Sequence, residues 1–276
     1  MISLDQILSI LVCPDHTSDP LILNGDFEMV CLLCTKSFKV LNNSPVKIDF
    51  TNGFVSGLLN VSRIGGNPKH WTNWRQENLE FLRGRNIGKD KLGLDIGAGD
   101  SLFHSILNLD NLMSIDFTNY PETNIISDLN FNIPLASSSF DYILMTNLLE
   151  HLYDSFVLEE AYRLLKKNSY LYITVPFLLG VHNAPYDYHR YTHFYLIKKL
   201  ELLGFEIEYF SPSGDLGSFE TLVEHYFRFP IHNGNLPAKI IWQVQKVINF
   251  LLKIAVPVNY RLEYTGGYMI SAKKIT

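Results

Sequence analysis

The chain has 276 residues, of which 47% are hydrophobic and 18% charged, and its net charge is −5 at pH 7. This apolar content is ample for a folded core, which excludes a chain that is disordered throughout. The acidic balance argues against a protein whose main task is to hold nucleic acid by bulk charge, so no strong nucleic-acid signal is found.

The N-terminal apolar run, Ile7–Val12, is short and follows an acidic residue rather than a basic segment. No stretch of the chain reaches ~18 apolar residues without polar interruption. We therefore expect neither a signal peptide nor a spanning helix, and cytoplasmic location is the default.

Three cysteines, Cys13, Cys31 and Cys34, lie within the first 34 residues. An odd number of cysteines is a poor disulfide framework. With His16 they form two closely spaced pairs, C-x2-H and C-x2-C, and two such pairs supply the four ligands of a tetrahedral zinc. Residues 1–50 are therefore predicted to be a small β-rich domain held by structural zinc. The alternative is a domain without metal whose cysteines are buried as small apolar residues.

The segments Cys13-Pro14-Asp15-His16, Cys31-Leu32-Leu33-Cys34 and Asn43-Ser44-Pro45-Val46 resemble the zinc-ribbon family that includes the activator subunit of tRNA and protein methyltransferases. His16 stands where that family usually has a second cysteine. The two runs Leu21–Leu23 and Glu28–Val30 predict a hairpin within this domain. A glycine-containing linker is expected over 51–69, followed by a helix over 70–85.

The next segment, KLGLDIGAGDS over 91–101, reads as a strand that breaks into a glycine turn. Gly97 and Gly99 allow backbone conformations and a close ligand approach that a Cβ would block. A helix is expected from Leu102 to about Asn108. A strand, a glycine loop and a helix N-terminus in this order bind nucleotide-like ligands at the end of a parallel sheet.

Strands and helices then alternate, which predicts a parallel α/β sheet with helices on both faces. The last strand is expected to pair antiparallel at the edge of the sheet. The strands are expected at 111–117, 124–128, 140–147, 169–177, 205–210 and 267–273. The helices are expected at 155–167 and 192–203, the second ended by Gly204.

Three aspartates, Asp95, Asp116 and Asp128, lie at or near the ends of the first three strands of this sheet, counted from the strand that precedes the glycine turn. The ends of parallel strands line one crevice. Asp116 suits the two hydroxyls of a ribose, and Asp128 suits an exocyclic adenine amine. A single aspartate there is often only a cap or turn residue, whereas the ordered set after a glycine turn is more specific.

The motifs LDIGAGDS, MSIDF, ISDLN, FDYILMTNLLEHL and YLYITVPF resemble the class I S-adenosylmethionine-dependent methyltransferases, in particular their type 11 branch. The resemblance implies a Rossmann-like seven-stranded methyltransferase sheet with helices on both faces, here preceded by the zinc ribbon, in a domain over 70–276. It departs from the family at Ser101, which replaces a third glycine. A dinucleotide oxidoreductase is disfavoured because Leu102 stands where its fingerprint has a glycine.

The resemblance also implies the residues that bind S-adenosyl-L-methionine. Asp95, Gly97 and Gly99 would shape the methionine pocket, and Asp116 would bind the ribose. Asp128 and Leu129 would bracket the adenine. Asn147 would lie near the sulfonium, with Glu150 and His151 behind it.

The segment VHNAPYDYHRYTHFY over 181–195 is where a catalytic base is expected, because it follows the fifth strand and is rich in histidine. It resembles a segment of methyltransferases that act on bacterial surface glycans and related small molecules. His182 is the favoured proton acceptor and His189 the second. Asp187 is a third candidate, with the alternative that it orders the loop by an ion pair to Arg190. Methyl transfer without any base also stays open.

An insertion is expected at about 212–264, with a long helix over 236–258. Its polar stripe includes three lysines and its other faces are apolar, so it suits a membrane surface, a partner chain or the core. The sequence therefore predicts a methyltransferase for a small-molecule, glycan or lipid-linked acceptor, cytoplasmic or membrane-peripheral, with an oligomer also open. The alternatives are an RNA or protein methyltransferase whose ribbon docks the substrate, and a non-catalytic cofactor-binding partner protein.

Overall fold

The computed structural model describes residues 2–25, 27–41, 47–51, 73–85, 87–88, 90–213 and 265–276, together with residues 237, 240, 243, 244 and 247. The linker expected at 51–69 falls outside this part of the chain, except for Thr51. So do most of the insertion at 212–264 and of its helix over 236–258. No helix within the described ranges is long and apolar enough to cross a membrane.

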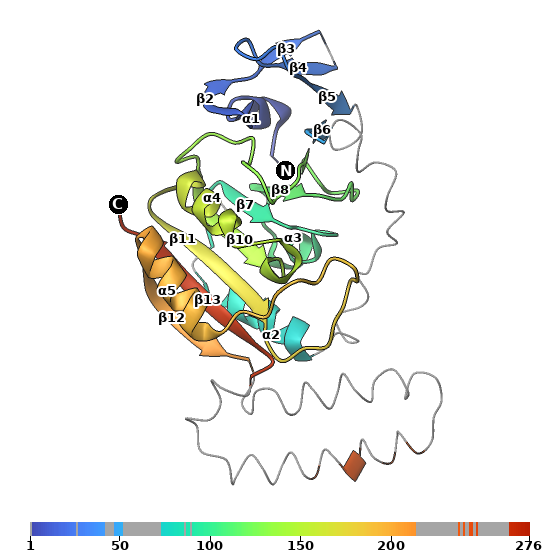
Figure 1. The fold of residues 1–276 in the computed structure, drawn as a ribbon, viewed down its shortest axis with the longest axis vertical. Helices are drawn as coiled ribbons and strands as arrows, with labels where there is room; N and C mark the ends of the chain where they lie inside the picture. The colour runs from blue at the N-terminus through green and yellow to red at the C-terminus, as the bar shows by residue number, and fades with distance from the viewer. Residues whose placement is uncertain are drawn as a thin grey trace.

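Within the described residues, eleven strands form one large sheet, in the order β12-β13-β11-β10-β7-β8-β9-β6-β5-β4-β3 (Figure 1). The first seven strands of this order form the predicted seven-stranded α/β sheet, which confirms the fold class. They are β7 (Gly93–Ile96), β8 (Leu112–Asp116), β9 (Ile125–Ile126), β10 (Phe140–Thr146), β11 (Leu165–Pro176), β12 (Phe205–Pro212) and β13 (Gly267–Lys274).

β13 pairs antiparallel with both β11 and β12. The antiparallel direction was predicted, but the edge position was wrong, because β12 forms that edge. Tyr268 and Ile270 in β13 are fully buried, as expected for a strand with neighbours on both sides. β12 carries the more exposed residues Glu206 and Glu208, and charged side chains suit an edge.

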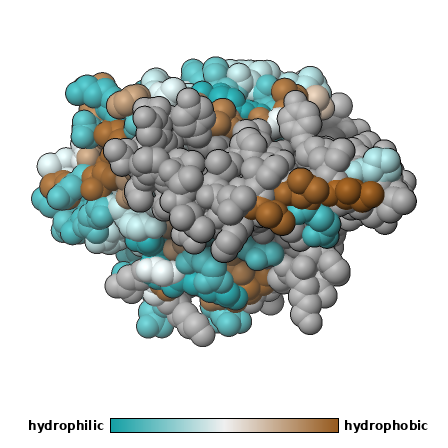
Figure 2. Space-filling model, turned by 90° about the horizontal axis from the view of Figure 1, so that it is seen from below, coloured by the Kyte–Doolittle hydropathy of each residue, from teal (hydrophilic) through white to brown (hydrophobic). Residues whose placement is uncertain are grey.

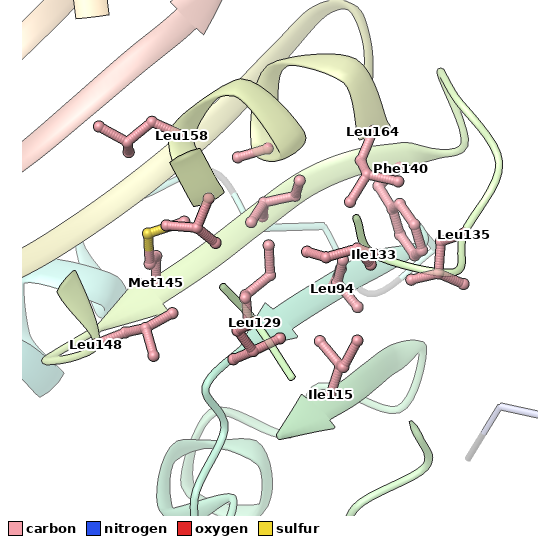
Figure 3. Close-up of a cluster of buried hydrophobic side chains, with 14 of the residues drawn as sticks. Leu94, Ile115, Leu129, Ile133, Leu135, Phe140, Met145, Leu148, Leu158 and Leu164 are labelled. Atoms are coloured by element: carbon pink, nitrogen blue, oxygen red, sulfur yellow. The ribbon is translucent and has the colours of Figure 1, made fainter. Parts of the chain in front are cut away.

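Four helices cover the two faces of this sheet: α2 (Asn73–Arg83), α3 (Leu102–Leu107), α4 (Phe156–Leu164) and α5 (His193–Leu203). Because side chains alternate along a strand, β10 serves both faces. Tyr142 and Leu144 belong to the core cluster that contains Trp74 of α2. Ile143 and Met145 belong to the cluster on the other face. Figure 3 shows that second cluster, with Met145, Leu158 and Leu164 around α4.

The ends of two helices test the local signals in the sequence. Thr192 caps α5 by accepting a hydrogen bond from the Tyr195 amide, and Gly204 ends it with φ +97°, as predicted for a terminal glycine. α4 was expected to reach Lys167 but ends at Leu164. Leu165 instead begins β11, where it is fully buried and lies opposite Phe140.

The N-terminal part consists of α1 (Leu4–Leu8), β1 (Val12–Cys13), β2 (His16–Pro20), β3 (Ile22–Asn24), β4 (Glu28–Val30), β5 (Ser37–Leu41) and β6 (Lys47–Asp49). Of these strands, β3 to β6 extend the same sheet, whereas β1 and β2 pair with each other in a separate two-stranded sheet. The predicted hairpin is present as β3 and β4.

β6 pairs parallel with β9, with Ile48 opposite Ile125. The Ile48 amide donates to Asn124 O at 3.0 Å, and the Phe50 amide donates to Ile126 O at 2.9 Å. This junction, which the sequence did not reveal, joins the ribbon to the larger sheet by backbone hydrogen bonds.

Candidate functional site

The glycine loop follows β7, and both of its glycines have positive φ, +73° at Gly97 and +55° at Gly99. A Cβ on Gly97 would lie 2.6 Å from Leu148 Cδ1, so this glycine lets the loop after β10 pack against it. A Cβ on Gly99 would meet no atom within 4 Å. Ser101 also has positive φ, at 51°, which explains why a glycine suits this position. Its buried hydroxyl has no hydrogen-bond partner in the described part of the chain.

Two carboxylates lie beside this loop. Asp95 is 2% exposed, with Oδ2 3.0 Å from Nε2 of His104, and its Oδ1 is buried without a partner among the described residues. Asp116 accepts hydrogen bonds from the Gly99 amide at 2.8 Å and the Thr118 amide at 2.7 Å. Burial raises the pKa of Asp116 to about 6, although these amides oppose the shift. A carboxylate has about four acceptor positions, so Asp116 retains two for a diol.

Asp128 borders a cavity of about 330 Å³ that the ribbon helps to enclose. Phe117 lines it from the end of β8, and Pro14, Lys36 and Phe38 line it from the N-terminal part. Oδ1 of Asp128 accepts from the amide and side chain of Asn130, which leaves Oδ2 for a ligand. The pocket expected to hold the adenine is thus lined by residues of both the N-terminal part and the larger sheet.

Leu129 has its side chain in the core, 2% exposed (Figure 3). Any contact that it makes with an adenine must therefore come from its backbone. That contact stays a prediction.

Asn147 directly follows β10 and has φ 51°. Its side-chain oxygen accepts a hydrogen bond from Nε1 of Trp74 at 2.8 Å. Helix α2 therefore fixes the side chain at the end of β10, next to the glycine loop that Leu148 contacts. This hydrogen bond was not predicted from the sequence.

A second polar cluster follows directly along the chain. Glu150 is fully buried, and neither carboxylate oxygen has a hydrogen-bond partner among the described residues. Oε1 lies 3.6 Å from Nε2 of His151 and 3.6 Å from Nε2 of His182. The carboxylate beside it raises the pKa of His182, although burial opposes the shift. The sequence singled out His182 but missed Glu150 as its neighbour.

The histidine-rich loop folds over this cluster. Asp187 is held by Arg190 at 2.5 Å and 2.8 Å, and it accepts from the His182 amide at 2.8 Å. Arg190 lowers the pKa of Asp187 to about 2. The ion-pair alternative for Asp187 is therefore observed. His189 donates from Nε2 to Tyr153 O at 2.8 Å, so this nitrogen is already engaged.

The four predicted metal ligands of the ribbon converge. Their ligand atoms all lie within 4.8 Å of one another. Cys13 Sγ is 3.7 Å from Cys34 Sγ, and Cys31 Sγ is 3.8 Å from Nδ1 of His16. Zn–S bonds of about 2.3 Å in a tetrahedron place sulfurs roughly 3.8 Å apart, so the arrangement fits zinc. Backbone N–H groups of Cys34 and Leu33 lower the pKa of Cys31 to about 6, and burial opposes them.

Residues 94–173 match the family model described as a methyltransferase domain. The chain carries a methyltransferase domain. The match spans the glycine loop, both aspartates and Glu150, and it agrees with the S-adenosylmethionine-dependent family expected from the sequence. No curated protein matches the sequence significantly.

Solved structures share the fold of this methyltransferase at low identity. One is the [4+2]-cyclase SpnF, at 14% identity and TM-score 0.51, covering 73% of this chain and 80% of that one. A second is a Haloferax volcanii complex of the methyltransferase activator Trm112 with a methyltransferase, at 14% identity and TM-score 0.50, covering 75% and 91%. A third is Haemonchus contortus phosphoethanolamine N-methyltransferase 2, at 16% identity and TM-score 0.50, covering 73% of this chain and 53% of that one.

The donor implied by the methyltransferase domain is S-adenosylmethionine, and the residues described above fit it. Among the described residues, Oδ1 of Asp95 has no hydrogen-bond partner, and Asp116 has two open acceptor positions. The N–H and O–H groups of the ligand would donate hydrogen bonds to these oxygens. Gly97 and Gly99 keep the loop free of side chains where the ligand would lie.

Proposed function

We propose that the protein transfers a methyl group from S-adenosylmethionine to an oxygen of a small-molecule, glycan or lipid-linked acceptor. The observation that carries this proposal is the buried Glu150 carboxylate with His182 beside it, three residues after Asn147. A group that makes a hydroxyl more nucleophilic matters when the acceptor is oxygen.

The bound donor supplies a methyl group activated by a positively charged sulfur. Asp116 would hold the ribose by accepting its hydroxyls, and Asp95 with the glycine loop would hold the methionine end. Asp128 would accept from the adenine amine. Asn147 is fixed by Trp74, and a fixed side chain there helps to align donor and acceptor, which is where much of the rate can arise.

His182 is proposed to activate the acceptor. Asp187 is proposed as the residue that positions His182, because it accepts from the His182 amide and lies 3.4 Å from Nδ1. His189, the second candidate base, receives no such support, since its Nε2 is engaged with Tyr153 O.

The ribbon is proposed to bind structural zinc through Cys13, His16, Cys31 and Cys34. The 3.7 Å and 3.8 Å spacings of the ligand atoms support this. Elemental analysis after purification without added metal should give close to one zinc per chain at this site. Loss of that zinc in Cys34→Ser would assign it to the ribbon, and zinc retained there would contradict the assignment.

A macromolecular substrate docked on the ribbon is the second candidate. It is favoured by the exposed Leu32 and Leu33 on the metal turn, 71% and 63% exposed. The likeness to a complex that contains an activator is consistent with it. Methylation of bulk tRNA or protein, abolished in Leu32→Ser/Leu33→Ser but with donor binding unchanged, would favour this candidate over a small acceptor.

Membrane or partner contact through the segment 236–258 also stays a proposal. Of its described residues, Ile240, Val244 and Val247 are 58%, 54% and 60% exposed and are spaced by four and three. Figure 2 shows the molecule from below, where hydrophobic surface lies among hydrophilic surface. Co-sedimentation with anionic vesicles, reduced in Ile240→Ser/Val244→Ser, would support a peripheral membrane role.

The donor half of the proposal is tested by calorimetry with S-adenosylmethionine, using Asp116→Ala as the control. Equal or absent heat in the two proteins would refute it. The transfer half is tested with methyl-labelled donor against glycan, lipid and small-molecule extracts. Binding without transfer to any acceptor would instead indicate the non-catalytic partner protein.

A further inference from the structure

The Glu150 side chain is the most unusual polar group in the described part of the chain. It has no exposed surface, and both of its oxygens lack a hydrogen-bond partner among the residues that the structure describes. A buried carboxylate is normally paired or binds a metal, because leaving it unpaired in the interior is very unfavourable. Its environment must therefore supply positive charge.

The two neighbouring histidines are oriented by their other ring nitrogen. Nδ1 of His151 is hydrogen-bonded to Tyr186 O. Nδ1 of His182 lies 3.2 Å from Gly180 O. A carbonyl only accepts, so each Nδ1 carries a proton. In the neutral rings both Nε2 atoms then direct a lone pair toward Glu150, the arrangement in which metal-binding histidines are held.

A shared proton is a weaker explanation than a cation. Nε2 of either histidine is 3.6 Å from Oε1, which is longer than an N–H···O hydrogen bond of about 2.7–3.2 Å. Ligands bound at about 2.0–2.2 Å to one tetrahedral ion lie roughly 3.3–3.6 Å apart. The three ligand atoms all lie within 4.8 Å of one another, so a small closure brings them onto a common ion.

We propose that Glu150, His151 and His182 bind a divalent transition-metal cation beside the glycine loop. Two imidazoles and one carboxylate suit Zn²⁺ and its neighbours in the first row, and three protein ligands leave a position open for substrate. Leu148 lies two residues before Glu150 and packs against Gly97, so it places the cluster next to the glycine loop.

The role of the cation rests on the proposed methyl transfer, whereas its binding does not. With the cation bound, His182 would activate the acceptor as a metal ligand and not as a proton acceptor. A hydroxyl or similar oxygen of the acceptor would enter the open position, and the positive charge would make it more acidic, with its proton passing to water. The site would therefore select oxygen-bearing acceptors and place their oxygen next to Asn147.

The test counts metal in the full-length protein. Wild type, Glu150→Gln, His182→Gln and His193→Gln are equilibrated with Zn²⁺, desalted and analysed for zinc. We expect one zinc per chain fewer in Glu150→Gln and in His182→Gln than in wild type. His193→Gln is the matched control and should keep the wild-type value, since the His193 ring packs on Phe194 and Tyr268 instead. The difference is the same whether or not the ribbon holds zinc.

Cobalt substitution identifies the ligands of the second ion. Co²⁺ in the Glu150 site should give d–d bands without the thiolate charge-transfer band that a ribbon site gives, and the d–d bands should be lost in His182→Gln. Equal zinc contents in all four proteins would overturn the proposal. His182 is partly exposed, so His182→Gln serves if Glu150→Gln does not fold. If Glu150→Gln and His182→Gln bind one zinc fewer than wild type but no methyl transfer is found, the proposed function is refuted and the metal site is not.

Discussion

Replacing Gly97 with alanine should destabilise the protein through two separable effects. The first is the left-handed backbone at φ +73°, which costs a non-glycine residue ~1–2 kcal/mol. The second is the contact of the new Cβ at 2.6 Å from Leu148 Cδ1, an overpacking that typically costs ~1–3 kcal/mol. Gly97→Ala should therefore lose about 2–5 kcal/mol of unfolding free energy in urea titrations.

Gly99→Ala is the matched control, because it has φ +55° but no atom within 4 Å of its Cβ. It should lose only the backbone part, ~1–2 kcal/mol. Adding Leu148→Ala to each variant completes a double-mutant cycle, and only the Gly97 pair should show coupling, of about the size of the overpacking. Equal losses in the two glycine variants, with no coupling to Leu148, would refute the close packing of the two loops.

Three further outcomes are expected. Affinity for S-adenosylmethionine should fall as the pH drops through about 6, the pKa of Asp116, because the ribose hydroxyls donate to the ionised carboxylate. Calorimetry of Asp116→Asn should show an affinity that does not change with pH. A wild-type affinity without a step near pH 6 would contradict this prediction. Because that pKa is raised from 3.8, the ligand-free protein should carry a stability contribution from Asp116 that is full below pH 3.8 and is lost as the pH rises through about 6, which melting of wild type and Asp116→Asn would detect. Asp187→Asn should lose ~1–3 kcal/mol, speed hydrogen exchange over 178–190 and lower kcat more than donor affinity, whereas unchanged exchange would show that the ion pair does not order the loop.

The sequence predicted well the features that are encoded locally. The glycine turn after β7 and the glycine that ends α5 each depend on a backbone conformation that few residues adopt, so the residue type identifies them. The convergence of Cys13, His16, Cys31 and Cys34 was predictable for a different reason, because each closely spaced pair lies on one tight turn.

Features that depend on long-range packing were not predictable. Glu150 and His182 are 32 positions apart in the printed sequence and meet only because the loop folds back, with its Tyr188 amide donating to Glu150 O. The early end of α4 also follows from tertiary structure, because burial of Leu165 beside β10 outweighs a local pattern compatible with helix. The place of β13 between β11 and β12 required knowledge of the whole sheet.

The pairing of β6 with β9 bears on how the sheet avoids pairing with other chains. β9 has two residues, and without β6 its outer side would present unpaired N–H and C=O groups next to the buried Ile125. Such an open edge can add strands from other chains. A variant that begins at residue 70 should thus aggregate even if its donor site could fold. With the ribbon present, the edge strand of the sheet is β3, which has three residues. A short strand is a poor template for further pairing.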